Sequence, residues 1–222
     1  MSWKKGPKSG DGDDGQDGRR GYHHGNLREA LIAAALDLIS RKGPAGFTFA
    51  EAARQAGVSP AAPYRHYKDR EALLADVAEQ GFIAFEQSLS AAWDNGRGGA
   101  GPALKRMGLA YLHFATTSPA WYSAMFESGL PMSAYPKLHA SGERALGLLR
   151  TACEALVADL PAGKRPPAMM MALHIWSLSH GIAGLFARGD GARRPLPMPP
   201  EDLLEAGILV YLDGLGIPKQ AR

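Results

Sequence analysis

Apolar residues recur at three- and four-residue steps through most of this sequence, and no stretch shows the two-residue alternation typical of a β-strand. The first periodic run covers residues 27–38, and Lys42-Gly43-Pro44 closes it with a cation, a glycine and a proline. Later runs lie at 104–114, 138–160, 169–188 and 200–215. Since 222 residues with 45% apolar content can bury a core, the periodicity predicts an all-α fold.

The excess of positive charge lies in the first third of the chain. Residues 1–21 carry five Lys/Arg against four Asp, residues 22–74 carry seven basic against five acidic residues, and residues 75–222 carry thirteen of each. A basic bias in one segment permits a polyanion-binding module there. We therefore expect a disordered tail at 1–21, which is rich in Gly, Asp and Lys, a small domain at 22–74, and a larger one at 75–218.

The sequence contains no recognisable pattern for catalysis, metal binding or phosphate binding. Its single cysteine, Cys153, rules out an intramolecular disulfide and a multi-thiolate metal site, and we expect an inert, buried thiol. The G-x-G-x-x-G strings that begin at Gly10 and Gly96 do not follow strands, so neither predicts a dinucleotide site. His23 and His24 cannot both face one ion from a helix. We expect no enzyme activity, metal or cofactor.

Two stretches without formal charge, 107–126 and 166–187, have the length of membrane spans. A Ser-Pro pair interrupts the first, and the second contains His174, His180 and Gly181 together with serines, so buried helices explain both better. No apolar run follows the N-terminal lysines, so no secretory signal is predicted. We expect a cytoplasmic protein without a membrane partner.

Three short helices are predicted in residues 26–67, and the second and third meet at Gly57-Val58-Ser59. Thr48 and Glu51 form a capping box at the start of the middle helix. Ser59 is expected to cap the third helix, with Pro60 in its first turn. Two helices joined by a tight turn that contains glycine are typical of the helix-turn-helix motif, whose second helix enters the DNA major groove.

The third predicted helix has side chains that suit contact with DNA. Its first residues are small, which permits close approach to base edges, and its later residues carry donors for phosphates and bases. The candidate contacts are Ser59, Pro60, Ala61, Ala62, Tyr64, Arg65, His66 and Lys68. Pro63 should tighten the first turn without breaking the helix, because at the fourth position it removes only one hydrogen bond. We expect Tyr67 to be buried and Tyr64 to lie at the rim.

The string GFTFAEAARQAGVSPAAPYRHYKDREALL at 46–74 resembles the DNA-binding domain of TetR/AcrR-family transcriptional regulators. The matching features are a threonine that opens the second helix, Gly-Val-Ser, Tyr-x-His-Tyr with a following basic residue, and Leu-Leu. YHHGNLREAL at 22–31 is similar to the approach to the first helix in one branch of that family. HIWSLSHGIAGLF at 174–186 resembles that branch's C-terminal regulatory signature. Its key residues here are Trp176, His180 and Gly181.

The resemblance implies that this protein binds operator DNA. It implies that Thr48 contacts phosphate, that residues 60–62 face the groove, and that Tyr64, His66 and Lys68 hold phosphates.

Two residues depart from the family pattern. Ala62 replaces a common hydroxyl residue and Pro63 replaces a common leucine, so base readout should lean on thymine methyl groups and on Arg65. Arg19 and Arg20 are candidates for a basic arm in an adjacent minor groove.

The larger domain is expected to bind a small apolar or aromatic effector. Adaptable methionines beside rigid aromatic rings suit a loosely specific pocket, although the same side chains also suit an ordinary core. His180 is the candidate for sensing a ligand or a proton. The predicted lining residues are Met107, Tyr111, Phe114, Trp121, Met125, Phe126, Trp176 and His180.

A homodimer is expected from small residues on the helix at 169–188, because a small-residue face lets helices pack closely, and with the last helix it would form a two-helix dimer face. These residues are Ala172, Ser179, Ala183 and Gly184. A twofold dimer would present two recognition helices about one duplex turn, roughly 34 Å, apart to a palindromic operator. The sequence thus predicts a dimeric repressor that a small molecule releases from DNA. The alternative is a helical small-molecule-binding or interaction protein without sequence-specific DNA binding.

Overall fold

The computed structural model describes residues 27–158, 160–187 and 197–217, and all regular structure within them is helical. The helices are α1 (Leu27–Lys42), α2 (Phe49–Gln55), α3 (Arg70–Trp93), α4 (Ala100–Thr117), α5 (Pro119–Phe126), α6 (Pro136–Leu156), α7 (Ala168–Ala187) and α8 (Pro200–Gly214). The predicted all-α fold is confirmed. The expected tail, the arginine arm and the motif at 22–26 lie outside the described residues.

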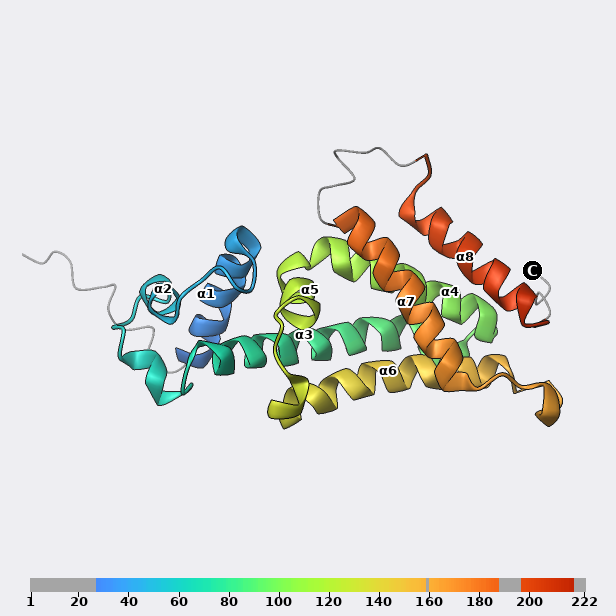
Figure 1. Ribbon diagram of the computed structural model, residues 1–222, viewed down its shortest axis with the longest axis horizontal. Coiled ribbons are helices and arrows are strands. Elements are labelled where there is room, and N and C mark those ends of the chain that lie inside the picture. The colour runs from blue at the N-terminus through green and yellow to red at the C-terminus, as the bar shows by residue number, and fades with distance from the viewer. Residues whose placement is uncertain (1–26, 159, 188–196, 218–222) are drawn as a thin grey trace, which may run out of the picture.

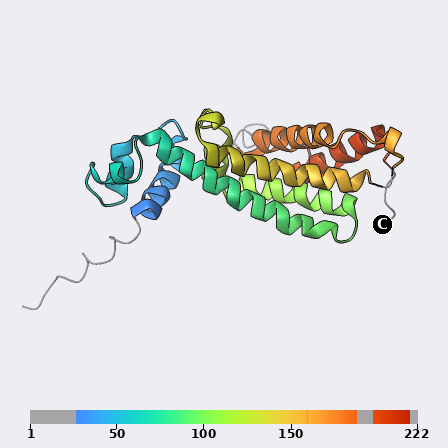
Figure 2. The same ribbon diagram turned by 90° about the horizontal axis from the view of Figure 1, so that it is seen from below.

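The molecule is elongated, with α1 and α2 at one end and α4 to α8 at the other (Figures 1 and 2). We call residues 27–69 the head and residues 94–217 the body. α3 joins them: it packs on α1 in the head and lies along α4, α5 and α6 in the body. Any shift of α3 in the body therefore acts directly on the head.

α3 starts at a side-chain cap and continues without a break past residue 74, where a domain boundary was expected. The Asp69 carboxylate accepts a hydrogen bond of 2.8 Å from the Ala72 amide, which satisfies one free donor of the first turn. Leu73 and Val77 are buried in the head, whereas Phe85 and Leu89 are buried in the body. One helix therefore supplies core residues to both parts.

The segment that follows α2 differs from the prediction. In place of an α-helix from Ser59 onward, the chain forms a single 3₁₀ turn, Ala62–Arg65, which is tight as expected but does not continue, and no side chain caps it. The cause is Pro63, which lacks an N–H, clashes with the carbonyl one turn earlier and disfavours the helical conformation of the preceding residue. The expectations that Pro63 leaves the helix intact and that Ser59 caps it are therefore wrong.

Residues Ala162–Phe186, which include most of α7, are long and apolar enough to cross a membrane by length and composition alone. One face of α7 is nevertheless buried within the body against α4 and α6, and it includes Met171, Ala172 and Ile175. The core helix of a globular fold passes the same test, so the criterion is weak support for a membrane span.

Candidate nucleic-acid interface and ligand cavity

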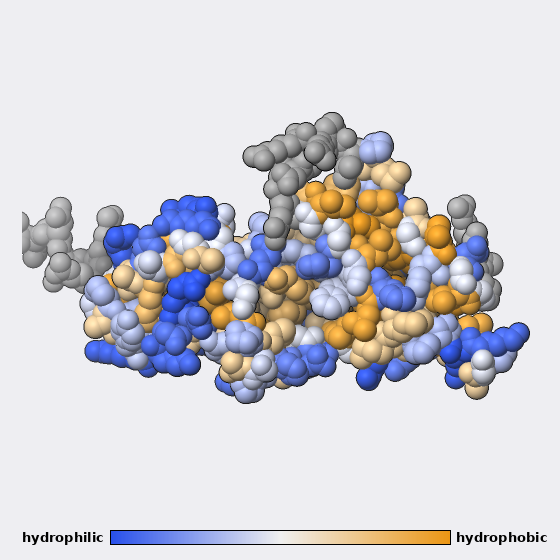
Figure 3. Space-filling model, in the orientation of Figure 1, coloured by the Kyte–Doolittle hydropathy of each residue, from blue (hydrophilic) through white to orange (hydrophobic). Residues whose placement is uncertain are grey.

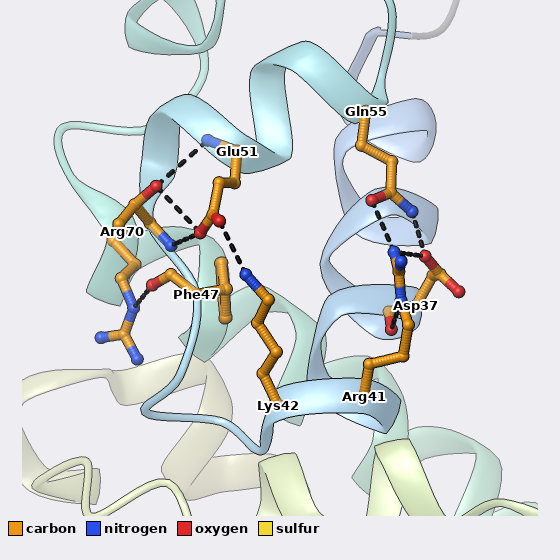
Figure 4. Close-up of polar contacts among 8 residues, drawn as sticks. Asp37, Arg41, Lys42, Phe47, Glu51, Gln55 and Arg70 are labelled. Atoms are coloured by element: carbon orange, nitrogen blue, oxygen red, sulfur yellow. Dashed lines mark hydrogen bonds and ion pairs between the residues drawn. The ribbon is translucent and has the colours of Figure 1, made fainter.

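A polar cluster fastens α2 to the C-terminal half of α1 (Figure 4). Arg41 donates a hydrogen bond of 2.8 Å to Gln55 Oε1 and forms an ion pair with Asp37. Gln55 also donates to the same carboxylate of Asp37. This closed set of contacts sets the position of α2 relative to α1.

The capping box predicted at the start of α2 is confirmed and is larger than expected. The Glu51 amide donates to Thr48 Oγ1 over 3.2 Å, and the Thr48 amide donates to Glu51 Oε2 over 2.8 Å. Lys42 Nζ lies 2.7 Å from Glu51 Oε1. The Lys42 ammonium and the Thr48 donors together lower the pKa of Glu51 to about 2. Thr48 itself is exposed at the tip of α2, where a phosphate could reach it.

Arg70, at the first position of α3, holds the loop that leads into α2. Its Nε donates a hydrogen bond of 2.9 Å to the Phe47 carbonyl, and its guanidinium also donates to the Pro44 carbonyl. The guanidinium carbon lies 4.9 Å from the centre of the Phe47 ring, a cation–π distance (Figure 4). No motif in the sequence pointed to this role, because it depends on residues more than twenty positions apart.

Tyr67 anchors the end of the 59–68 segment to α3. Its hydroxyl donates to Asp76 Oδ2 over 2.5 Å, and Arg28 of α1 binds the same carboxylate with contacts of 2.8 and 2.5 Å. Burial and then the Asp76 carboxylate raise the pKa of the Tyr67 phenol above its ordinary value. Tyr67 is buried, as expected.

The candidate DNA contacts lie together on the outer surface of the head, most of which is hydrophilic in Figure 3. Tyr64 is 62% exposed and rests edge-on against Phe49, with ring centres 5.0 Å apart. The Lys68 side chain is 75% exposed, with Asp69 at 3.7 Å as its carboxylate neighbour. Ala62 is half-buried. The remaining exposed candidates are Ser59, Pro60, Ala61, Arg65 and His66.

A cavity of about 400 Å³ lies in the body between α3, α5, α6 and the loop after α5. Its size is within the usual range for small-molecule sites, about 300–1,000 Å³. The wall is mainly apolar. None of the apolar wall residues from α3 and α6 was predicted from the sequence to bind a ligand. These are Phe82, Phe85, Leu89, Ala145, Leu146 and Leu149.

Half of the predicted ligand-binding residues lie on the cavity wall. These are Tyr111, Met125, Phe126 and Trp176. Met107 is instead a core residue with 2% exposure. Phe114 packs against Phe85 with ring centres 5.1 Å apart. The Trp121 ring packs close to Gly81 of α3. These three and His180 do not line the cavity.

His180 lies one layer behind the wall, between two tyrosines. Its Nδ1 is 2.9 Å from the Tyr111 hydroxyl and 2.8 Å from the Tyr122 hydroxyl, and the two hydroxyls are 3.5 Å apart. Burial raises the pKa of Tyr111 above its ordinary value, so the phenol stays protonated. Tyr122 also lines a smaller cavity of about 240 Å³, together with Ile39 and Ser40 of α1. The histidine therefore connects the wall of the large cavity with the contact between body and head.

The small-residue face of α7 does not point outward as expected. Ala172, Ser179 and Ala183 are buried inside the chain, because α7 uses this face to pack on α4 and α6. A different face of α7, together with α8, exposes large apolar side chains, and Figure 3 shows a hydrophobic area over this region. Its members are Met169, Met170, Leu173, Leu185, Leu209 and Val210.

Cys153 is fully buried in α6. Burial, and then the charge of Glu154, raise the pKa of its thiol to about 12, so it is held in the unreactive protonated form. Within the described ranges, no three His, Cys, Asp or Glu side chains gather in a geometry that could hold a metal ion.

Two protein-family models match successive parts of the chain. The one described as "Bacterial regulatory proteins, tetR family" matches residues 31–77, and the one described as "Tetracyclin repressor-like, C-terminal domain" matches residues 104–211. No curated protein is significantly similar to the chain in sequence.

Solved structures share the whole arrangement. A protein of unknown function from Rhodococcus sp. RHA1 is 29% identical, with a TM-score of 0.73 over 88% of this chain and 98% of its own. A tetR-family bacterial regulatory protein from Rhodococcus RHA1 is 21% identical, with a TM-score of 0.68 over 87% and 99%. The regulator PfmR from Thermus thermophilus is 19% identical, with a TM-score of 0.63 over 86% and 99%.

Proposed function

The chain belongs to the TetR family of transcriptional regulators, and from this membership we propose that it is a repressor that leaves a palindromic operator when a small molecule fills the cavity of the body. We also propose that it acts in the cytoplasm and catalyses no reaction. The division of labour follows the two matched segments: the head and the start of α3 bind DNA, and the body binds the effector and a second copy of the chain.

The observation that carries the proposal is the exposed 59–68 segment on a firmly held support. Tyr64 and Lys68 extend from it into solvent, while Tyr67 anchors it to α3 through Asp76. Donors that are fixed in place before binding lose little conformational freedom when phosphates arrive. In our proposal the short 3₁₀ turn presents Pro60 to Ala62 at the groove, and Arg65 reads bases.

We propose that the exposed apolar face of α7 and α8 is the dimer interface. A patch that includes Leu185 at 58% exposure and Val210 at 74% exposure is unfavourable in water, and pairing with an identical patch would bury both. Gly181, on the same side of α7 as Leu185, has nothing within 4 Å of the position a Cβ would take, so a partner helix could approach closely there. Two heads would then face one duplex.

The effector would act through α3, since that helix supplies both the cavity wall and the head core. Phe82 and Phe85 line the cavity, and Leu73 and Val77 of the same helix are buried in the head. A ligand that shifts α3 would change the spacing of the two heads. Because the coupling is reciprocal, operator DNA must weaken effector binding by the same factor.

Binding of the full-length protein to duplex DNA from the region flanking its own gene tests the proposal. Fluorescence anisotropy should show that Tyr64→Ala and Lys68→Ala weaken binding to all sequences. Lys68→Ala should also reduce the salt dependence by about 0.9 in slope for each phosphate it no longer neutralises, which is about 1.8 for the two copies in a dimer. Lys164→Ala, which changes an exposed lysine in the body, is the matched control and should bind like wild type.

Unchanged binding by both head variants would contradict the assigned DNA-binding surface. Failure of wild type to bind would favour an interaction protein.

A further inference from the structure

The wall of the 400 Å³ cavity carries formal charge at a single residue. Glu143 of α6 belongs to the wall and is also exposed, so it lies at the mouth. No lysine, arginine or histidine is among the lining residues, and Tyr111 and Ser128 are the uncharged polar ones. A molecule that enters therefore meets one carboxylate and no cation.

The two arginines of α6 are already engaged with other carboxylates. Arg144 Nε lies 3.0 Å from Glu86 Oε2, and Arg150 Nε lies 3.4 Å from Glu154 Oε1. Across the described part of the chain, Glu143 takes part in no ion pair. Its charge is therefore available to a ligand.

We propose that the cavity selects apolar cations, with a hydrophobic body held between α3, α5 and α6 and an amine or ammonium group beside Glu143. This inference rests on the proposed function, because it names the chemical class of the effector. A carboxylate of the same shape would bring a second negative charge to the mouth, and the lining residues include no positive charge to offset the repulsion. A neutral molecule would gain the apolar contacts alone.

The test uses three probes that share one apolar body and differ in the end group: phenylbutylamine, phenylbutanol and phenylbutyrate. Calorimetric titration of the full-length protein at low ionic strength should rank the amine first, the alcohol second and the acid last. The step from amine to acid should be on the order of tenfold, as expected for a partly exposed charge contact.

Substitutions of Glu143 test whether this residue causes the preference for the amine. Glu143→Gln should abolish the advantage of the amine and leave phenylbutanol binding unchanged. Glu143→Lys should reverse the order, so that phenylbutyrate binds best. Glu154→Gln, the same chemical change near the far end of α6, should keep the wild-type order. Equal affinities of the three probes for wild type, or no binding of any, would overturn the proposed ligand class.

A cavity-filling variant separates this inference from the proposed function. Leu146→Trp puts a larger side chain on the wall and should weaken all three probes alike. If the variant binds phenylbutanol as tightly as wild type, the cavity is not the site, and the effector site itself is wrong. If the variant loses binding but wild type shows no order among the probes, the site stands and the charge preference is overturned.

Discussion

The head and the body each contain a buried tyrosine network, and the two networks are built from different chemistry. In the head, Tyr67 donates to Asp76, whose carboxylate also binds Arg28. In the body, Tyr111 and Tyr122 share one ring nitrogen of His180. The first network contains full opposite charges in fixed positions. In the second network, two phenol hydroxyls compete for one imidazole nitrogen.

The difference fits the tasks proposed for the two parts. A DNA-binding surface gains from a rigid support, since every phosphate contact depends on its position. A ligand-responsive region needs alternatives of similar free energy, because a ligand shifts an equilibrium only as far as it binds the two states differently. A ligand that bonds the Tyr111 hydroxyl would leave His180 Nδ1 to Tyr122, next to the contact with α1.

The largest expected effect is the loss of the proposed dimer when a charge is placed on the exposed apolar face of α7 and α8. Val210→Glu places a charge in the proposed dimer interface, where it would have no partner, so sedimentation should show a monomer. Operator binding should weaken because one head must then act without the other. Ala140→Glu, at an exposed site on α6, is the control and should remain a dimer. A dimeric Val210→Glu protein would place the interface elsewhere.

Removal of Asp76, the charged centre of the head network, should cause the next largest effect, a loss of stability. Asp76→Ala leaves the Tyr67 hydroxyl and Arg28 without their shared acceptor, and we expect a loss of about 2 kcal/mol in the free energy of unfolding. Urea denaturation measures it. Tyr67→Phe, which keeps the ion pair between Asp76 and Arg28, should lose about half as much. Equal stability of Asp76→Ala and wild type would show that the network does not hold the head.

Loss of one hydroxyl from the body network should reduce the stability of the protein by less than loss of Asp76 from the head. Tyr122→Phe removes one of the two hydroxyls that share His180 Nδ1 and leaves that nitrogen to Tyr111, so we expect a loss of about 1 kcal/mol or less in urea denaturation. A loss larger than that of Asp76→Ala would reverse the comparison between the two regions.

The smallest effect concerns the cap of α2 and depends on pH. The pKa of Glu51 is lowered from 4.5 to about 2, so its ionised form stabilises the fold. This contribution is complete above pH 4.5 and is lost as the pH falls toward 2. Wild type should therefore be more stable than Glu51→Gln at neutral pH, and their melting temperatures should converge in acid. A constant difference between the two proteins across this range would contradict the assignment.

Local sequence signals predicted the head well up to Gln55. Thr48 and Glu51 lie three positions apart, so their capping box could be read directly. Pro63 was misjudged because its missing N–H was counted as its only effect, whereas its ring also clashes with the preceding turn and restricts the backbone of Ala62. Arg70 was missed altogether, since its contacts with Phe47 and Pro44 are tertiary.

In the body, periodicity located the helices but could not tell wall from core. Met107 and Tyr111 lie one turn apart on α4, yet Tyr111 lines the cavity and Met107 packs in the core. Which of them faces the cavity depends on how α4 is rotated against α3 and α6, and a single sequence does not contain that information. For the same reason, the face of α7 that carries small residues such as Ala172 was expected to meet a second copy of the chain, whereas it is buried within the body.

A hydroxyl-radical footprint on the duplex that flanks the gene measures the central claim most directly. Two heads held by one dimer should protect two patches whose centres lie about one helical turn, roughly 34 Å, apart on one face of the DNA. Lys68→Ala should lose both patches together. Protection of a single patch, or of none at concentrations that saturate binding, would contradict the proposed arrangement.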